Sequence, residues 1–154
     1  RRPPRSTLFP YTTLFRSDQR ILTMLEADGR ATLAQLAQAT GLSVSAAQSR
    51  VQKLEKRGII KGYKAIIDQE QRGLPISAFV NVTPLDYSAE SSIPDKLNNI
   101  DGIVSCYSVA GAPSFVLVVR VASPTALEEL LNLIHRTVPV STETTMILQT
   151  YFAH

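Results

Sequence analysis

Residues 32–60, TLAQLAQATGLSVSAAQSRVQKLEKRGII, restrict the fold of this chain most, because they predict two short helices joined by a tight turn. Thr32 and Gln35 have the spacing of a capping box, which starts a helix. Gly41 ends that helix, since glycine adopts the left-handed backbone conformation at little cost. Ser43 can then cap the second helix with its hydroxyl. Two helices separated by a glycine-containing turn are typical of a helix-turn-helix.

The second helix of this stretch is expected to have one apolar and one polar face, and Gly58 is expected to end it. The predicted buried residues are Val44, Ala47, Val51 and Leu54, and the polar face carries Ser45, Gln48, Ser49, Gln52, Lys53 and Lys56. Short polar groups suit base edges and cations suit phosphates, so this face favours DNA recognition over a merely solvated surface. The candidate DNA-binding residues are Ser43, Ser45, Gln48, Ser49, Arg50 and Lys53. Arg50 lies at the edge of the face, where it could pair with Glu26 or Glu55 instead.

The first 17 residues, RRPPRSTLFPYTTLFRS, have neither helical nor strand periodicity. They resemble the translation of a short-read sequencing adapter, whose bases CTCTTCCGATCT encode residues 14–17 and whose upstream bases reproduce the rest. We therefore expect residues 1–17 to be a non-native, unstructured segment. The alternative is a natural basic arm that contacts DNA through Arg1, Arg2 and Arg5.

Charge is distributed unevenly along the chain. The net charge of +3 depends on four arginines in the first 17 residues, so the total says little about partners. Residues 18–68, however, carry a net charge of +3 and residues 69–154 carry −4. This distribution indicates that only the front half contacts a polyanion.

The remaining pattern predicts an α+β protein with two domains. A first helix is expected at residues 18–27 and a roughly alternating strand at residues 59–67, followed by a hinge at residues 68–75. The back half reads as strands at residues 76–82, 103–109, 115–121 and 142–151, with helices at 94–100 and 124–137. That order matches a ferredoxin-like βαββαβ domain. We assign residues 18–60 to a winged-type helix-turn-helix domain, 61–75 to a linker strand and hinge, and 76–154 to the second domain.

Several classes of protein find little support in the sequence. No apolar run is long enough to cross a membrane, and Cys106 is the single cysteine, so a reduced cytoplasmic setting is expected. His135 and His154 are the two histidines, and they form no cluster with cysteine that could bind a metal. We expect no catalytic residues, no metal and no cofactor.

At this point the chain resembles the Lrp/AsnC (feast/famine) family of bacterial transcription regulators. The motifs that carry the resemblance, from residue 18 to the end, are Asp18-x-x-Ile21-Leu22, Asp28-Gly29-Arg30, Gly41-Leu42-Ser43, Arg50-Val51-x-x-Leu54-Glu55, Gly58-Ile59-Ile60-x-Gly62-Tyr63, Ser108-Val109-Ala110-Gly111 and Thr142-x-Thr144. SVSAAQSRV, CYSVAG and VRVASPTALEELL are most similar to actinobacterial members, among them regulators of alanine dehydrogenase.

The resemblance implies double-stranded DNA and an amino-acid effector as partners, and homodimers that pair through their sheets and assemble further, often to octamers. It places the effector near the loop at residues 111–114, with Tyr107, Gly111, Ala112, Ser114, Thr142 and Thr144 as candidate effector-binding residues. Many members carry an acidic residue in this loop, where this chain has Ser114. Gly111 is expected to make the sharp reversal of the loop, because Pro113 biases Ala112 to an extended conformation.

Two other functions remain open at this stage. One is a DNA-architectural protein of the same fold that binds DNA without tight sequence choice. The other, which the sequence favours much less, is an enzyme that reuses the fold, such as a sirohaem decarboxylase subunit.

Overall fold

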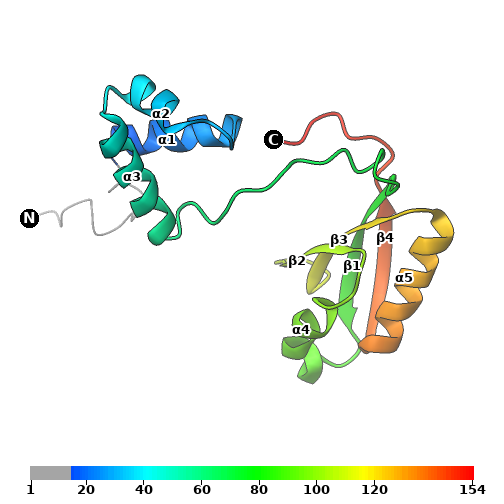
Figure 1. The fold of residues 1–154 in the computed structure, drawn as a ribbon. Helices are drawn as coiled ribbons and strands as arrows, with labels where there is room; N and C mark the ends of the chain where they lie inside the picture. The colour runs from blue at the N-terminus through cyan, green and yellow to red at the C-terminus, as the bar shows by residue number, and fades with distance from the viewer. Residues whose placement is uncertain (1–14) are drawn as a thin grey trace, which may run out of the picture. The chain divides into compact units, whose positions relative to one another are not determined.

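The computed structural model describes residues 15–154, which divide into two compact units (Figure 1). The first unit ends at Ile66 and the second spans Ile67–His154. This boundary lies inside the segment 61–75 that the sequence predicts as linker and hinge. Residues 1–14, which hold most of the adapter-like segment, lie outside the described residues.

The first unit contains three helices around a small apolar core. They are α1 (Arg16–Ala27), α2 (Leu33–Thr40) and α3 (Val44–Lys56). The core consists of Ile21, Leu36, Ala37, Ala47, Val51 and Leu54. Helix α1 begins two residues before the expected start, so the prediction that residues 1–17 are unstructured is wrong for Arg16 and Ser17. The extension has a local cause, because the Phe15 backbone N–H donates to the Asp18 carboxylate at 3.4 Å.

The start of α2, its end at Gly41 and the start of α3 are fixed as the sequence predicts. The Gln35 N–H donates to the Thr32 hydroxyl at 3.2 Å and the Thr32 N–H donates to the Gln35 side chain at 2.8 Å, which is the reciprocal capping box. Gly41 ends α2 with a φ of 75°, a left-handed conformation that favours glycine. The Ala46 N–H donates to the Ser43 hydroxyl at 3.1 Å and so starts α3.

Two sequence predictions about this unit are wrong. Val44, expected on the buried face of α3, is 50% exposed because it occupies the first turn, beyond the reach of the core that holds Ala47 and Val51. The strand expected at residues 59–67 does not form in the described chain. A strand needs a neighbour for its backbone hydrogen bonds, and no segment pairs with these residues.

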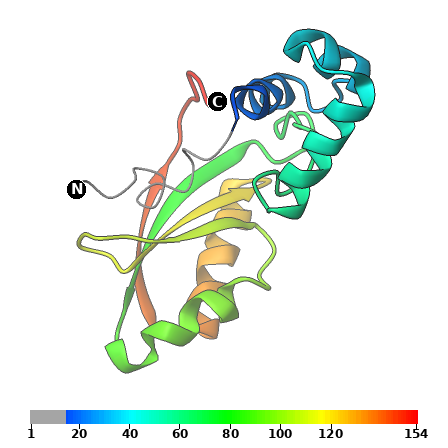
Figure 2. The same ribbon diagram turned by 90° about the vertical axis from the view of Figure 1, so that its left-hand side faces the viewer.

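The second unit is built on a four-stranded antiparallel sheet in the order β2-β3-β1-β4. Its elements are β1 (Ile76–Pro84), a 3₁₀ helix (Tyr87–Ser92), α4 (Ile93–Leu97), β2 (Ile103–Ser108), β3 (Phe115–Val121), α5 (Pro124–Thr137) and β4 (Val140–Met146). The order and antiparallel pairing are those of the predicted ferredoxin-like domain. In Figure 2 the hairpin that joins β2 to β3 projects from one end of the sheet.

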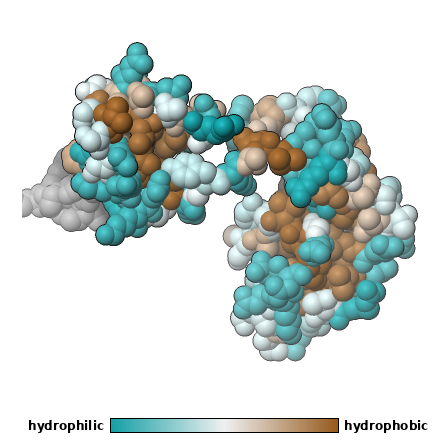
Figure 3. All heavy atoms as spheres, viewed as in Figure 1, coloured by the Kyte–Doolittle hydropathy of each residue, from teal (hydrophilic) through white to brown (hydrophobic). Residues whose placement is uncertain are grey.

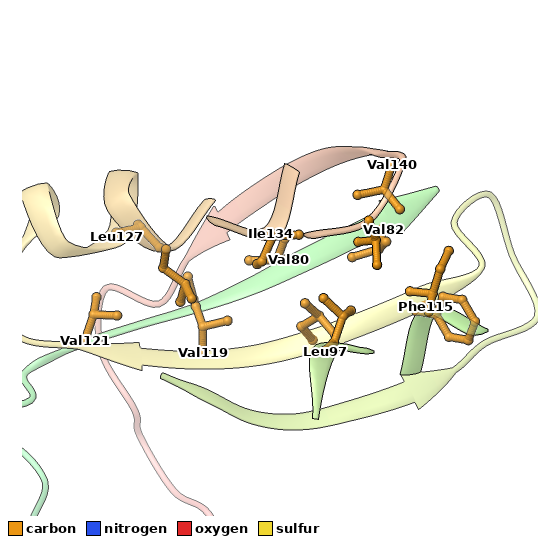
Figure 4. Packing of buried hydrophobic residues seen from close by; sticks show 14 residues of the cluster. Val80, Val82, Leu97, Phe115, Val119, Val121, Leu127, Ile134 and Val140 are labelled. Carbon is orange, nitrogen blue, oxygen red and sulfur yellow. The ribbon is translucent and has the colours of Figure 1, made fainter. Parts of the chain in front are cut away.

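One face of the sheet packs against α4 and α5 to form the main core. Alternate residues of β3 are buried, and alternate residues of β1 are buried in step with them, because opposite residues of antiparallel strands share a face. Figure 4 shows these side chains meeting Leu97 of α4 and Leu127 and Ile134 of α5. The buried stripe of α5, with Leu127, Leu130 and Ile134, confirms the amphipathic helix expected at residues 124–137.

Three boundaries in the second unit differ from the sequence prediction. In place of the single helix expected at residues 94–100, the 3₁₀ helix leads into the five-residue α4, which ends at Leu97. The last strand covers Val140–Met146 instead of residues 142–151, because its ladder ends where β1 begins. The hinge expected at residues 68–75 contains a closed turn, in which the N–H groups of Arg72, Gly73 and Leu74 donate to backbone carbonyls at 2.8–3.1 Å.

Of the glycines in the second unit, Gly102 should be the one whose substitution destabilises the core most. Its φ is 95°, and an added Cβ would lie 3.3 Å from Leu130 Cδ2 in α5. We expect Gly102→Ala to lower the free energy of unfolding by about 1–2 kcal/mol or more, through backbone strain and displacement of Leu130. The control is Gly62→Ala, which has open space and no positive φ and should stay within about 0.5 kcal/mol of wild type. Urea denaturation followed by circular dichroism measures both, and equal stability of the two variants would contradict the strain argument.

Candidate functional site

The surface of α3 that faces away from the first core carries the predicted DNA-binding residues. Ser45, Gln48, Ser49 and Lys53 are exposed, together with Gln52 and Lys56, whereas Ala47, Val51 and Leu54 are buried on the opposite side. Lys53 and Lys56 lie in the last turn, where cations are favoured by the helix dipole. The helix therefore presents a rigid row of short polar groups that ends in two ammonium groups.

Ser43 is also exposed, but its hydroxyl is already engaged in the cap of α3. The oxygen accepts from Ala46 and lies 3.3 Å from the Ser45 hydroxyl oxygen. Ser43 therefore fixes the start of the helix and orients Ser45. Ser45 is the first of these side chains placed to reach a ligand.

The contacts of Arg50 differ most from those that the sequence predicts. Its Nη1 lies 3.8 Å from Asp18 Oδ2 in α1, and its guanidinium carbon lies 4.3 Å from the centre of the Phe15 ring. Neither expected alternative partner, Glu26 or Glu55, takes this role. Sequence reasoning missed Asp18 and Phe15 because their approach to Arg50 depends on the packing of α1 on α3.

Glu55 instead ties α3 to the segment that follows it. The Tyr63 hydroxyl donates to Glu55 Oε1 at 3.0 Å. Partial burial, this hydrogen bond and the negative charge of Glu55 all raise the pKa of Tyr63, because each disfavours the phenolate.

The loop at residues 109–114 is the second candidate site. The Val109 N–H donates to the Ser114 carbonyl at 3.1 Å, and the Ser114 N–H donates to the Val82 carbonyl of β1 at 3.0 Å. These bonds anchor the end of the loop to the sheet and leave Gly111 and Ala112 exposed. Within the described residues, no hydrogen bond involves the N–H groups of Gly111 and Ala112. Two such donors can hold a carboxylate.

The expected role of Gly111 in the reversal is wrong. The glycines with positive φ are Gly41, Gly58, Gly73 and Gly102, and Gly111 is not among them. A Cβ at this position would meet only Pro113 Cδ, at 3.9 Å, which is an ordinary contact. Pro113 and the two anchoring hydrogen bonds shape the loop, so the backbone accepts other residues at position 111.

The remaining candidate effector residues lie on different strands and faces of the sheet. Thr142 and Thr144 lie opposite Val82 and Val80, on the helix-covered face of the sheet, and Thr142 Oγ1 is 2.9 Å from His135 Nε2 of α5. Tyr107 is in β2, close to the loop in sequence, and lies opposite Val116 on the other face. Strand β1 separates β4 from β3, so Thr142 and Thr144 lie across β1 from the strands that carry the loop.

Together, a capped helix-turn-helix with an exposed polar helix and a sheet unit with a donor-bearing loop define a DNA-binding protein with an attached ligand-binding domain. Comparison with known families agrees with both parts. Residues 14–61 match the model for a winged helix-turn-helix DNA-binding domain, and residues 77–154 match the Lrp/AsnC ligand binding domain. The chain belongs to the Lrp/AsnC family of transcriptional regulators, as its motifs suggested.

The relatives and their structures are similar over nearly the whole chain. The HTH-type transcriptional regulator LrpA of Mycobacterium tuberculosis is 52% identical over 136 residues, covering 88% of this chain and 91% of that protein. LrpC of Bacillus subtilis is 35% identical and covers 75% and 79%. A solved structure of a feast or famine regulatory protein from M. tuberculosis complexed with L-methionine has a TM-score of 0.86 and 52% identity, covering 89% of this chain and 93% of that one.

Within residues 15–154, no group of three or more His, Cys, Asp or Glu side chains lies close enough to hold a metal ion. None of the helices in the same range is long and apolar enough to span a membrane. The relatives of this chain are named as transcriptional regulators.

Lys53 and Gln48 should contribute to DNA binding in different ways. Lys53→Gln should weaken binding to any DNA sequence and make the slope of log affinity against log salt shallower by about 0.9, because one phosphate contact is lost. Gln48→Ala should keep that slope and cost about 1–3 kcal/mol on the preferred sequence alone. Fluorescence anisotropy titrations over a salt series measure both effects. If neither variant differs from wild type, α3 is not the recognition helix.

Substitution of Gly111 should change how well the ligand reaches the loop without destabilising the fold. Because the loop backbone there is unstrained, Gly111→Ala and Gly111→Val should both keep wild-type stability within about 0.5 kcal/mol. The larger Val side chain should block the free N–H groups and abolish the amino-acid response, while DNA binding persists. Thermal denaturation tests the first statement, and DNA titrations with and without the effector test the second. A full response in Gly111→Val would place the ligand elsewhere.

Proposed function

We propose that this protein is a sequence-specific DNA-binding regulator whose assembly and DNA affinity respond to an amino acid, and that it controls genes of amino-acid metabolism in the cytoplasm. The observation that carries the proposal is the exposed face of α3, where Ser45, Gln48 and Ser49 precede Lys53 on a helix fixed at its start by the Ser43 cap. Such a helix can enter the major groove with its polar residues at base edges and its cations at phosphates.

The loop at residues 109–114 is the proposed contact for the effector. Its free N–H groups suit the carboxylate of an amino acid, and the Ser114 hydroxyl can accept from the ammonium group. A relative of this family has a solved structure in complex with L-methionine, which makes an apolar amino acid the first ligand to test. Ser114 offers no negative charge, so the ammonium must find its stronger partner on another residue or another subunit.

The sheet supplies the proposed dimer contact. Phe79 opposes Val118 in the strand register, and Val116, two residues before Val118, opposes Tyr107, so all four lie on the face away from α4 and α5. Phe79 and Tyr107 are 43% and 55% exposed. Figure 3 views this unit from another side and shows hydrophobic residues at that surface as well. A second copy would bury this face, and dimers would then assemble into a higher oligomer. Effector contacts from different sides of the sheet could meet between such copies.

The effector should be found by a thermal-shift panel of the twenty amino acids on the full chain. A ligand that binds the folded state raises the melting temperature. At a ligand concentration of about a hundred times its dissociation constant, the free energy of unfolding rises by about 2.7 kcal/mol. We expect L-methionine or another apolar amino acid to give the shift, and expect the same compound to change DNA affinity and sedimentation.

DNA titrations in the presence of the same amino acids separate this function from the alternatives. DNA binding that random duplexes compete away fully, with no effect of any amino acid, would instead favour an architectural role. Absence of DNA binding at low salt would contradict both of these functions.

A further inference from the structure

Asp18 is a buried acid whose charge is matched by a residue of the recognition helix. Its side chain is almost fully buried, at 4% exposure, although it lies in the first turn of α1. Oδ2 accepts from the Phe15 N–H at 3.4 Å and is 3.8 Å from Arg50 Nη1, and Oδ1 has no hydrogen-bond partner among the described residues. A buried carboxylate with so few donors needs a cation nearby, because its water has been removed.

Arg50 is held from two sides by α1 and the residue before it. Its guanidinium lies beside the Asp18 carboxylate and over the Phe15 ring, and its side chain is 31% exposed. Arg50 follows Ser49 directly and precedes Lys53 by one turn, so it borders the face of α3 that is proposed to contact DNA. Arginine is a stronger phosphate ligand than lysine because its guanidinium binds in a bidentate manner. A free Arg50 would therefore add a strong contact that does not depend on sequence.

We propose that Asp18 is a positioning residue that sets the sequence specificity of this regulator by withholding Arg50 from the DNA backbone. The proposal rests on the proposed function, since it assumes that α3 contacts DNA. With Arg50 retained by Asp18, the polar side chains of Ser45 and Gln48 carry a larger share of the binding, and non-specific affinity stays low. Phosphate contacts position a protein on DNA, whereas base contacts specify the sequence.

The test compares Asp18→Asn with wild type on two duplexes, one selected from a random-sequence pool and one of unrelated sequence. Asparagine keeps the shape but not the charge, so Arg50 is released. We expect the slope of log affinity against log salt to become steeper by about 0.9, the value for one added phosphate contact. We also expect a tighter complex with the unrelated duplex and a smaller affinity ratio between the two. Asp18→Glu, which keeps the charge, should retain the wild-type slope.

Matched variants isolate the contact. Glu26→Gln removes an exposed negative charge from the same helix and should leave the slope unchanged. The double variant Asp18→Asn with Arg50→Gln should return to the wild-type slope, because the released cation is gone. A wild-type slope in Asp18→Asn, or a steeper slope that persists in the double variant, would overturn the proposal.

Arg50→Gln alone keeps the proposal testable even if Asp18→Asn fails to fold. It leaves Asp18 buried without its cation, so the variant should melt below wild type, yet its salt slope should match wild type in the range where it is folded. If Arg50→Gln made the salt slope shallower by as much as Lys53→Gln does, Arg50 would already contact phosphate, and the proposal would be overturned. If wild-type protein bound neither duplex, the DNA-binding function itself would fail, which is a different result from unchanged slopes.

Discussion

The burial of one face of α3 is the interaction on which the DNA-binding unit depends. Ala47, Val51 and Leu54 pack against Ile21 of α1 and Leu36 of α2, and this contact fixes the rotation of α3 about its own axis. Rotation decides which side chains face outward, so the apolar contact determines that Ser45, Gln48 and Lys53 share the exposed face. The capping bonds at Thr32 and Ser43 fix where α2 and α3 begin. Recognition chemistry in this unit is thus a consequence of core packing.

The parts of the structure that follow from local rules could be predicted from the sequence, and the parts that depend on distant partners could not. The caps at Thr32 and Ser43, the left-handed Gly41 and the stripe of α5 each need only a few neighbouring residues, and all are present. The strand expected at residues 59–67 needed a pairing partner that the described chain does not supply. The partner of Arg50 lies 32 positions away, where no spacing rule reaches. The turn assigned to Gly111 follows from its residue type and from the effect of Pro113 on Ala112, yet Gly111 has no positive φ, and the bonds of Ser114 to Val109 and Val82 anchor that loop.

The second unit shows why the candidate effector site is less complete than the DNA-binding face. The candidate DNA-binding residues all lie on α3 or its cap, so one chain presents them together. The candidate effector residues come from a loop between β2 and β3 and from the edge strand β4, and strand order places β1 between them. Strand spacing is about 4.8 Å, so β3 and β4 are separated by roughly 10 Å across β1. If the loop of one copy and the β4 residues of another bind the same effector, ligand binding is linked to assembly.

The uneven distribution of charge along the chain favours DNA binding by the first unit over binding by the second. Residues 69–154 carry twice as many acids as bases, eight against four, so this part of the chain repels a polyanion. Attraction must then come from the cations of the first unit and the segment after it. Of these, Arg50 is paired with Asp18, which leaves Lys53 and Lys56 as the cations on the face of α3 itself. If this face contacts DNA as proposed, so few cations would give it modest non-specific affinity, and base contacts would decide where it binds. In an oligomer the same contacts are repeated on several recognition helices, which raises total affinity by effective concentration without lowering the selectivity of each helix.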